Sequence, residues 1–574
     1  MTRKTINQVF LLVALVFLVS CTTIEDNKTK IDDWTFTPGN TESGGIISSI
    51  RNAVGGGVQY MAMSAPKMME SSIGFSVGGA KDINNFRENI KNNFLPVSTD
   101  LTYEGLFYDY YFDTGKKGEC TKLFCPSYSY SISKDPVSKE DQYYLSVGLN
   151  SNIKESDFKR KKLNLVVVLD ISGSMGSSFN RYYYDRFKNG KLELNKTDED
   201  ESKSKMEVAT KSLTALLDHL NPDDRLGVVL FDNGAYLAKS LNLMEKADLQ
   251  KLKDHILEVR PQGGTNMESG MKLGSELFDK LSNADQSEYE NRIIFMTDAM
   301  PNTGQTSKEG LFGMMKKNAD TKIYSTFIGI GVDLNTELIE VMTKIRGANY
   351  YSVHSAKEFK NRLDNEFEFM VTPLVFNLNL NLEAKGYKIE KVYGSPEANE
   401  ATGEIMKVNT LFPSKTEDGQ TRGGLVLLKL KKLSPDASLK LKVTYEDRLG
   451  RKESSEASID LQTKQPDYFE NNGIRKGILL ARYADLMKNW INDERKSVEN
   501  PSVNEEVGII VPFEEDFKLG KWERQSVKLT ISNQYKELFK EFSKYFEKEK
   551  NEIGDDTLKK EVDLLELLAK DLFI

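Results

Sequence analysis

The chain has 574 residues, which is too long for one hydrophobic core and predicts three or four structural units. Hydrophobic residues make up 39% and charged residues 29%, a balance that is typical of a globular body and argues against a protein with many membrane spans. The formal net charge is −8 and no long basic run is present, so the composition argues against nucleic acid as a partner.

The N-terminus carries the one strongly apolar segment. Arg3 and Lys4 supply a positive flank to residues 9–19, an apolar run that is too short to span a bilayer but typical of a secretory signal. The run ends in Leu18-Val19-Ser20-Cys21, which resembles the bacterial lipobox. The resemblance implies that Cys21 is lipidated, with an ordinary cleaved signal as the alternative. We therefore expect residues 1–21 to be a lipoprotein signal peptide and the protein to be anchored in the bacterial cell envelope, with the outer membrane favoured.

Two segments precede the centre of the chain. Residues 22–83 are rich in Gly, Ser, Asn and Thr and show little periodicity, which predicts a flexible tether. Residues 84–160 begin with a helical pattern and continue into aromatic stretches such as 106–112, so we expect a β-rich N-terminal unit. Cys120 and Cys125 lie in this unit. Export favours a disulfide between them, and the alternative, a zinc site, would lack a nearby His.

Residues 161–370 alternate apolar strand runs with helical patterns. Residues 163–169 are almost continuously apolar, as in a strand buried on both faces, and residues 206–220 have the three-and-four spacing of a helix. Further strands are expected at 226–231, 293–297 and 322–328, and further helices at 267–281, 308–316 and 336–345. The alternation predicts a doubly wound, mostly parallel, Rossmann-like α/β sheet.

The last two hundred residues change pattern again. Apolar residues alternate with polar ones between 371 and 463, which predicts antiparallel strands and a C-terminal β-sandwich. Residues 464–574 are expected to be helical, with Gly554 ending one helix and Asp555 and Asp556 capping the next. The predicted fold class is therefore multidomain, α/β plus β.

Polar side chains follow the predicted α/β strands where these end. Asp170, Ser172 and Ser174 form an Asp-x-Ser-x-Ser loop after the first strand, Thr265 follows two glycines, and Asp298 ends the strand at 293–297. In open α/β sheets ligands bind beyond the carboxyl ends of the strands, so these three loops can converge.

These five residues resemble, position for position, the metal-ion-dependent adhesion site of von Willebrand factor type A domains. The resemblance implies that the Ser and Thr hydroxyls bind a metal directly and that the Asp carboxylates often act through water. Such hard oxygen donors suit Mg²⁺, with Ca²⁺ or Mn²⁺ as alternatives. With few direct anionic ligands, the cation could accept an Asp or Glu carboxylate from a protein partner.

An insertion at residues 176–204 follows the metal loop directly and carries Tyr182, Tyr183 and Tyr184, so it could cover or frame the site. The alternative is a solvated loop whose aromatic residues have no role in recognition. The wider layout resembles bacterial surface or periplasmic lipoproteins and, loosely, inter-alpha-trypsin inhibitor heavy chains.

We expect a metal-dependent protein-binding lipoprotein that is not an enzyme. The chain has three His, no His-Glu-x-x-His motif and no nucleotide-binding loop. A structural envelope component and an uncharacterised hydrolase are the alternatives.

Overall fold

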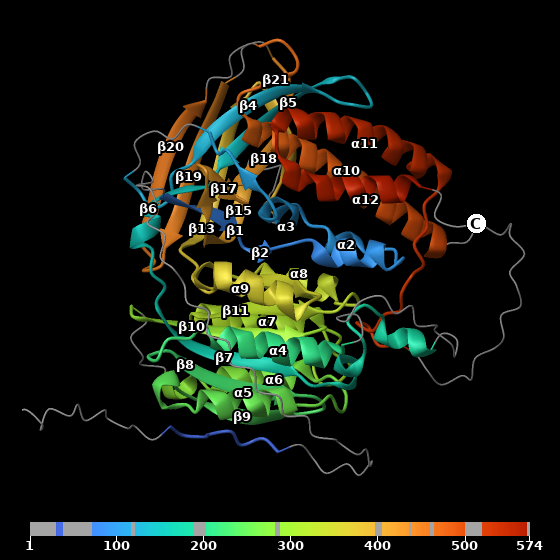
Figure 1. Cartoon of the computed structure of the whole chain (residues 1–574). Coiled ribbons are helices and arrows are strands. Elements are labelled where there is room, and N and C mark those ends of the chain that lie inside the picture. Colours follow the sequence, from blue (N-terminus) through green and yellow to red (C-terminus); the bar gives the residue numbers. More distant parts are fainter. Residues whose placement is uncertain are drawn as a thin grey trace, which may run out of the picture.

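The computed structural model describes residues 30–37, 72–115, 121–187, 203–281, 287–395, 404–434, 438–459, 464–499 and 519–570. Figure 1 shows an α/β layer at the bottom, with a β-rich region and a helical region side by side above it. The predicted signal peptide and Cys21 lie outside the described residues. None of the described helices combines the length and the apolar character that crossing a membrane requires.

The α/β layer is built on a seven-stranded sheet with the strand order β2-β12-β11-β10-β7-β8-β9. Its strands are β2 (Gly79–Ala80), β7 (Lys162–Asp170), β8 (Arg225–Phe231), β9 (Ala235–Leu243), β10 (Tyr289–Thr297), β11 (Ile323–Ile330) and β12 (Asn349–Val353). Every neighbouring pair is parallel except β8 and β9. The predicted doubly wound, mostly parallel sheet is confirmed.

Six helices cover the two faces of this sheet: α4 (Lys205–Leu217), α5 (Leu249–Glu258), α6 (Met267–Glu276), α7 (Lys308–Asp320), α8 (Thr336–Thr343) and α9 (Ala356–Met370). The central strand β7 is apolar from Leu165 to Leu169, and both of its faces are buried. Leu165 and Val167 pack in the core beneath α4, α5 and α9, but Val166 and Val168 pack beneath α6, α7 and α8, and each of these layers excludes water from its face of the sheet.

The β-rich region contains two large sheets, in the orders β20-β19-β13-β15-β1-β6 and β14-β18-β5-β4-β21, and a small sheet β16-β17-β3. The strands are β1 (Ser72–Val77), β3 (Tyr111–Phe112), β4 (Ser127–Lys134), β5 (Asp141–Gly148), β6 (Asn150–Lys154), β13 (Val375–Lys385), β14 (Tyr387–Tyr393), β15 (Glu404–Ser414), β16 (Thr416–Glu417), β17 (Gln420–Arg422), β18 (Leu425–Lys432), β19 (Ser438–Asp447), β20 (Lys452–Ile459) and β21 (Tyr468–Phe469). The predicted separation of a unit at 84–160 from a sandwich at 371–463 is wrong. β1 pairs with β15, and β5 pairs with β18, because a hairpin such as β4–β5 cannot bury both faces alone.

Two further corrections concern the N-terminal third. Part of the predicted tether is ordered: β1 and β2 lie at 72–80, and residues 30–37 run along β9, where Thr35 N donates to Ala238 O. Gly and Ser in this composition conceal the alternation of Ile73, Phe75 and Val77, all of which are buried. The predicted strand at 106–112 is confirmed only at its end, as β3, because residues 106–108 belong to the helix α3 (Tyr103–Tyr108), whose start is capped by the Thr102 hydroxyl.

The helical region consists of α10 (Asn472–Glu499), α11 (Asn533–Ile553) and α12 (Lys559–Ala569), together with α2 (Asn84–Lys91) and α3. One apolar core holds these helices together and includes Trp490, Phe539 and Leu565. Gly554 ends α11 in a left-handed conformation at φ 73°, and the Asp555 carboxylate caps the next turn.

Candidate metal centre

The Asp-x-Ser-x-Ser loop begins at the last residue of β7. Asp170 is fully buried, and its carboxylate accepts hydrogen bonds from Ser172 N at 2.8 Å and from Thr297 Oγ1 at 2.6 Å. The chain then enters the short 3-10 turn η3 (Gly173–Gly176), which places the hydroxyls of Ser172 and Ser174 3.1 Å apart. The loop therefore presents two buried hydroxyls next to a buried carboxylate.

The Thr265 loop is tied to this first loop by backbone hydrogen bonds. Gly173 N donates to Gly263 O at 3.0 Å, and Gln262 N donates to Ile171 O at 2.6 Å. Gly263 has φ +68°, and a Cβ there would approach the Asp232 carboxylate to 3.0 Å, so glycine is required by both conformation and space. Thr265 itself is buried, and its N–H donates to Asn302 Oδ1 at 2.9 Å.

Asp298 follows β10, the neighbour of β7, and brings two residues that sequence reasoning missed. The Asp298 Oδ2 accepts a hydrogen bond from the Lys205 ammonium at 3.0 Å. The same ammonium lies 2.6 Å from a carboxylate oxygen of Asp333. All three side chains are fully buried, and Asp298 Oδ1 has no hydrogen-bond partner. Lys205 begins α4 and Asp333 follows β11, so both also lie at the carboxyl edge of the sheet.

The charges of this cluster do not balance. The Lys205 ammonium pairs with Asp298 and Asp333, and a third buried carboxylate, on Asp170, interacts with Asp298. Burial and the neighbouring Asp298 raise the pKa of Asp170 to about 7, and burial raises the pKa of Asp333 despite Lys205. Burial alone would lower the pKa of Lys205, but Asp298 and Asp333 raise it above its ordinary value. When all three carboxylates are ionised, the negative charges exceed the positive charge by two, which is the charge that a divalent cation would balance.

The donor set also fits a hard cation. Among the residues that the structure describes, no three His, Cys, Asp or Glu side chains gather closely enough to hold a metal by themselves. The hydroxyls of Ser172, Ser174 and Thr265 would have to complete the ligand set, and hydroxyl and carboxylate oxygens are the ligands that Mg²⁺ and Ca²⁺ prefer.

The five predicted site residues thus reach one edge of the sheet, but they do not lie open to solvent. The turn η4 (Tyr183–Phe187) from the insertion places the Tyr183 hydroxyl over the metal loop, 3.3 Å from where a Cβ of Gly173 would lie. Of the insertion at 176–204, residues 188–202 lie outside the described part of the chain.

A segment from the far end of the chain completes the rim. Trp522 is buried against the α/β layer and donates its Nε1 to Thr306 O at 2.7 Å. The Glu523 carboxylate accepts from Tyr184 OH and, at 3.0 Å, from Asn302 Nδ2, the same side chain that holds the Thr265 loop. In Figure 1 this red segment descends from the helical region to the teal turn beside the α/β layer. Nothing in the local sequence predicts this long-range contact.

The predicted disulfide stays a prediction. Cys125 is buried in the β-rich region, but Cys120 lies outside the described residues.

Comparison with known proteins identifies the α/β layer. Residues 165–301 match the family described as von Willebrand factor type A domain. The chain is 25% identical over 224 residues to inter-alpha-trypsin inhibitor heavy chain H1 of Mesocricetus auratus, which covers 38% of this chain and 21% of the hamster protein. Heavy chain 4 of Mus musculus is 25% identical over 178 residues, covering 30% of this chain and 19% of the mouse protein. The chain thus spans about a fifth of these relatives.

A bacterial protein and a solved structure are also similar to this chain. An uncharacterised protein of Synechocystis is 22% identical over 250 residues, which cover 43% of this chain and 51% of that protein. The structure of a von Willebrand factor type A protein from Catenulispora acidiphila has 14% sequence identity and a TM-score of 0.40, and the alignment covers 67% of this chain and 85% of that one.

Proposed function

Because this chain carries a von Willebrand factor type A domain, we propose that it binds a protein partner through a divalent cation held by Asp170, Ser172, Ser174, Thr265 and Asp298. The observation that carries the proposal is a fully buried cluster of three carboxylates and one ammonium, which has two negative charges in excess when all its groups are ionised. Burying uncompensated charge is costly, and a divalent cation removes that cost. Mg²⁺ is the first choice, since it accepts a partly hydrated site, with Ca²⁺ or Mn²⁺ as alternatives.

A cation bound here would supply an electrophilic centre for an Asp or Glu carboxylate of the partner. The chain's own residues set the conditions for that contact. Lys205 holds Asp298 in place, and Asn302 holds the Thr265 loop. The surrounding protein excludes water, which strengthens a carboxylate–cation contact. We therefore propose that this site binds a partner and does not catalyse a reaction.

The rim around the site would make the second set of contacts. Tyr183 and Tyr184 come from the insertion, and tyrosine is enriched where proteins recognise each other. Since Glu523 already accepts hydrogen bonds from Tyr184 and Asn302, the partner has to contact or displace the segment at 520–526. We therefore expect Tyr183→Ala to change which partners are captured more than it changes the affinity for metal.

The test is metal-dependent partner capture by the intact protein. After crosslinking in the cell envelope, partners should be recovered in Mg²⁺ or Mn²⁺ and lost in EDTA. Thr265→Ala and Asp298→Ala should no longer capture the partner. Asp320→Ala should still capture it, because Asp320 is an exposed residue on α7 of the same domain. Capture that persists in EDTA and in Asp298→Ala would place the recognition surface elsewhere, on the β-rich region in the first instance.

We also propose that lipidated Cys21 anchors the protein in the envelope, in the outer membrane in the first instance. A lipid-anchored body stays with membranes in high salt when several acyl chains insert. Cys21→Ser should therefore release the protein into the soluble fraction. Complete membrane association of this variant after high salt would reject the anchor.

A further inference from the structure

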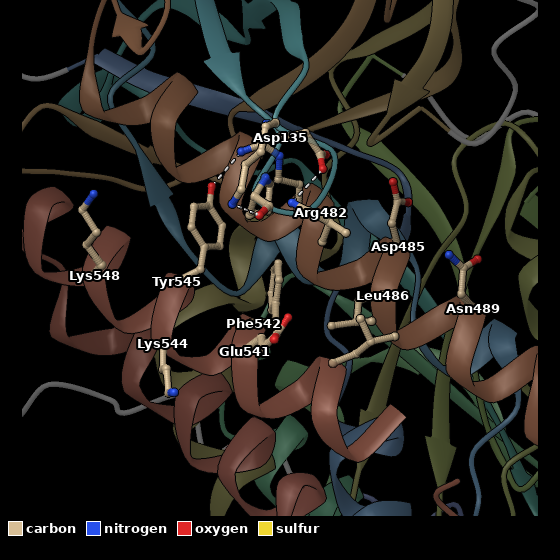
Figure 2. A pocket seen from close by; sticks show the side chains of 14 residues that line it. Asp135, Arg482, Asp485, Leu486, Asn489, Glu541, Phe542, Lys544, Tyr545 and Lys548 are labelled. Atoms are coloured by element: carbon tan, nitrogen blue, oxygen red, sulfur yellow. Dashed lines mark hydrogen bonds between the residues drawn. The ribbon is translucent and has the colours of Figure 1, made fainter. Parts of the chain in front are cut away.

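A pocket of about 800 Å³ lies in the upper part of the molecule, between the turn that joins β4 to β5 and the helices α10 and α11 (Figure 2). Its apolar wall includes Leu486, Leu538 and Phe542, and Val137 at its edge is 70% exposed. The volume falls within the range of about 300–1,000 Å³ that is typical of small-molecule sites. No residue of the proposed metal centre lines it.

Arg482 supplies the buried polar group of this pocket. Only 8% of the residue is exposed, and its guanidinium donates to Tyr545 OH at 2.7 Å, Ser133 Oγ at 3.2 Å and Gln142 Oε1 at 2.9 Å. All three acceptors are neutral, and Arg482 Nε has no hydrogen-bond partner. Within the described part of the chain, no carboxylate forms an ion pair with Arg482 at 4 Å or less. Arg482 is thus a buried cation whose counter-ion is missing.

The carboxylates that line the pocket are already engaged elsewhere. Asp485 accepts from Lys391 Nζ and from Tyr103 OH, each at 2.6 Å. Asp135 accepts the backbone N–H groups of Val137 and Ser138 in the turn, and it attracts Arg482 only from beyond ion-pair distance. Solvent screens the remaining charges of the pocket because their side chains are exposed; these are Lys139 in the turn and Glu541, Lys544 and Lys548 on α11. Arg482 is therefore the buried positive centre of a pocket that has one apolar wall.

We propose that this pocket binds a small amphiphilic carboxylate, with its hydrocarbon chain along Leu486, Leu538 and Phe542 and its head group on Arg482. A guanidinium forms charge-assisted hydrogen bonds to a carboxylate, and Arg482 lines this pocket with only neutral acceptors on its guanidinium. The long bond to Ser133 is the one that the head group can replace. This proposal does not depend on the metal centre.

Calorimetric titration of the full chain with octanoate, 1-octanol and acetate tests the proposal. Octanoate should bind, 1-octanol should bind at least tenfold more weakly, and acetate should show no binding, since both the charge and the chain are needed. Arg482→Gln should weaken octanoate at least tenfold and leave 1-octanol unchanged, whereas Leu486→Gln should weaken both. Arg475→Gln, on the same helix but paired with Glu549 outside the pocket, is the matched control and should change neither.

The outcome is decisive in both directions. Octanoate that fails to bind, that binds no more tightly than 1-octanol, or that binds equally to wild type and Arg482→Gln overturns the proposal. Thermal unfolding of each variant accompanies the titrations. If Arg482→Gln does not fold, Leu486→Gln decides, because Leu486 is half-buried and a polar side chain can be accommodated there.

Discussion

Two buried aspartates in different regions of the molecule have opposite titration behaviour. Asp109, at the end of α3 in the helical region, lies 2.6 Å from Arg87 and 3.9 Å from Lys560. Burial raises its pKa, but Lys560 and Arg87 outweigh burial and hold the pKa at about 2. Burial and a neighbouring carboxylate instead raise the pKa of Asp170, at the carboxyl edge of the α/β sheet, to about 7.

The difference separates a structural cluster from a candidate functional one. In the helical region two carboxylates, Asp109 and Glu561, face two cations, Arg87 and Lys560, so folding itself completes the charge balance. At the sheet edge Lys205 pairs with Asp298 and Asp333, and among the described residues no ion pair is formed by Asp170. A group whose burial is unfavourable without an outside partner is more characteristic of a binding site than of a core. The predictions below test this comparison.

The largest effect is expected from breaking the balanced cluster. Arg87→Met leaves Asp109 and Glu561 buried with too little positive charge, and removal of one partner from a buried ion pair costs about 3–5 kcal/mol. Thermal unfolding should report a correspondingly lower Tm. Lys559→Met is the matched control on α12, because that lysine pairs with Asp563 in solvent, and its Tm should not change. If the Tm of Arg87→Met equals that of the wild type, the cluster does not stabilise the fold.

The second prediction concerns the unbalanced cluster. Mg²⁺ at about 100 times its dissociation constant should stabilise the protein by about 2.7 kcal/mol, because it binds only the folded state. Asp298→Asn should abolish this gain, whereas Asp320→Asn should retain it. Differential scanning calorimetry with Mg²⁺ or EDTA measures both. A gain of the same size in Asp298→Asn would exclude this site.

The third prediction is a pH dependence of the metal-free protein. With a folded pKa of about 7 and an unfolded value of 3.8, Asp170 holds a proton in the folded state that it lacks in the unfolded state between these pH values. Its contribution to stability should therefore fall as pH rises from about 4 to 7. In EDTA at pH 8, Asp170→Asn should be more stable than wild type, because the amide carries no charge that burial would penalise. The difference should vanish near pH 4, and urea titrations at both pH values measure it.

The sequence predicted the positions of the candidate site residues, but it did not predict which other side chains surround them. The reason is physical. Asp170, Thr265 and Asp298 each follow a strand or a glycine turn, so local patterns and the rule about strand ends place them together. Lys205 is at the start of a helix after an insertion, and its approach to Asp298 depends on how that helix packs. The contact of Glu523 with Asn302 joins residues 221 positions apart.

Contacts between residues far apart in the chain also explain the errors in the predicted domains. Residues 84–160 and 371–463 each have the alternation of strands, but alternation does not specify which strand pairs with which. β5 and β18 meet only because both need a neighbour to bury their apolar residues. In the predicted tether, the alternation in β1 spans only six residues.

The smallest expected effect concerns the residue after Asp298. Ala299 adopts φ 58°, in the left-handed region, where a residue with a Cβ is strained by roughly 1–2 kcal/mol. Ala299→Gly relieves this strain, but it loses about 0.8 kcal/mol of methyl burial and about 0.5–1 kcal/mol of backbone entropy. These contributions nearly cancel, so urea denaturation should show a change below about 1 kcal/mol.

The matched control is Ala209→Gly, in α4 of the same domain. Ala209 is equally buried, and it adopts an ordinary helical conformation, so no strain is relieved there. Its loss should exceed that of Ala299→Gly by roughly 1–2 kcal/mol. Equal losses in the two variants would mean that the left-handed conformation beside Asp298 stores no strain. In that case the backbone conformation of Ala299 does not help to position the Asp298 carboxylate, which Lys205 contacts. Mg²⁺ should then stabilise Ala299→Gly as much as it stabilises the wild type.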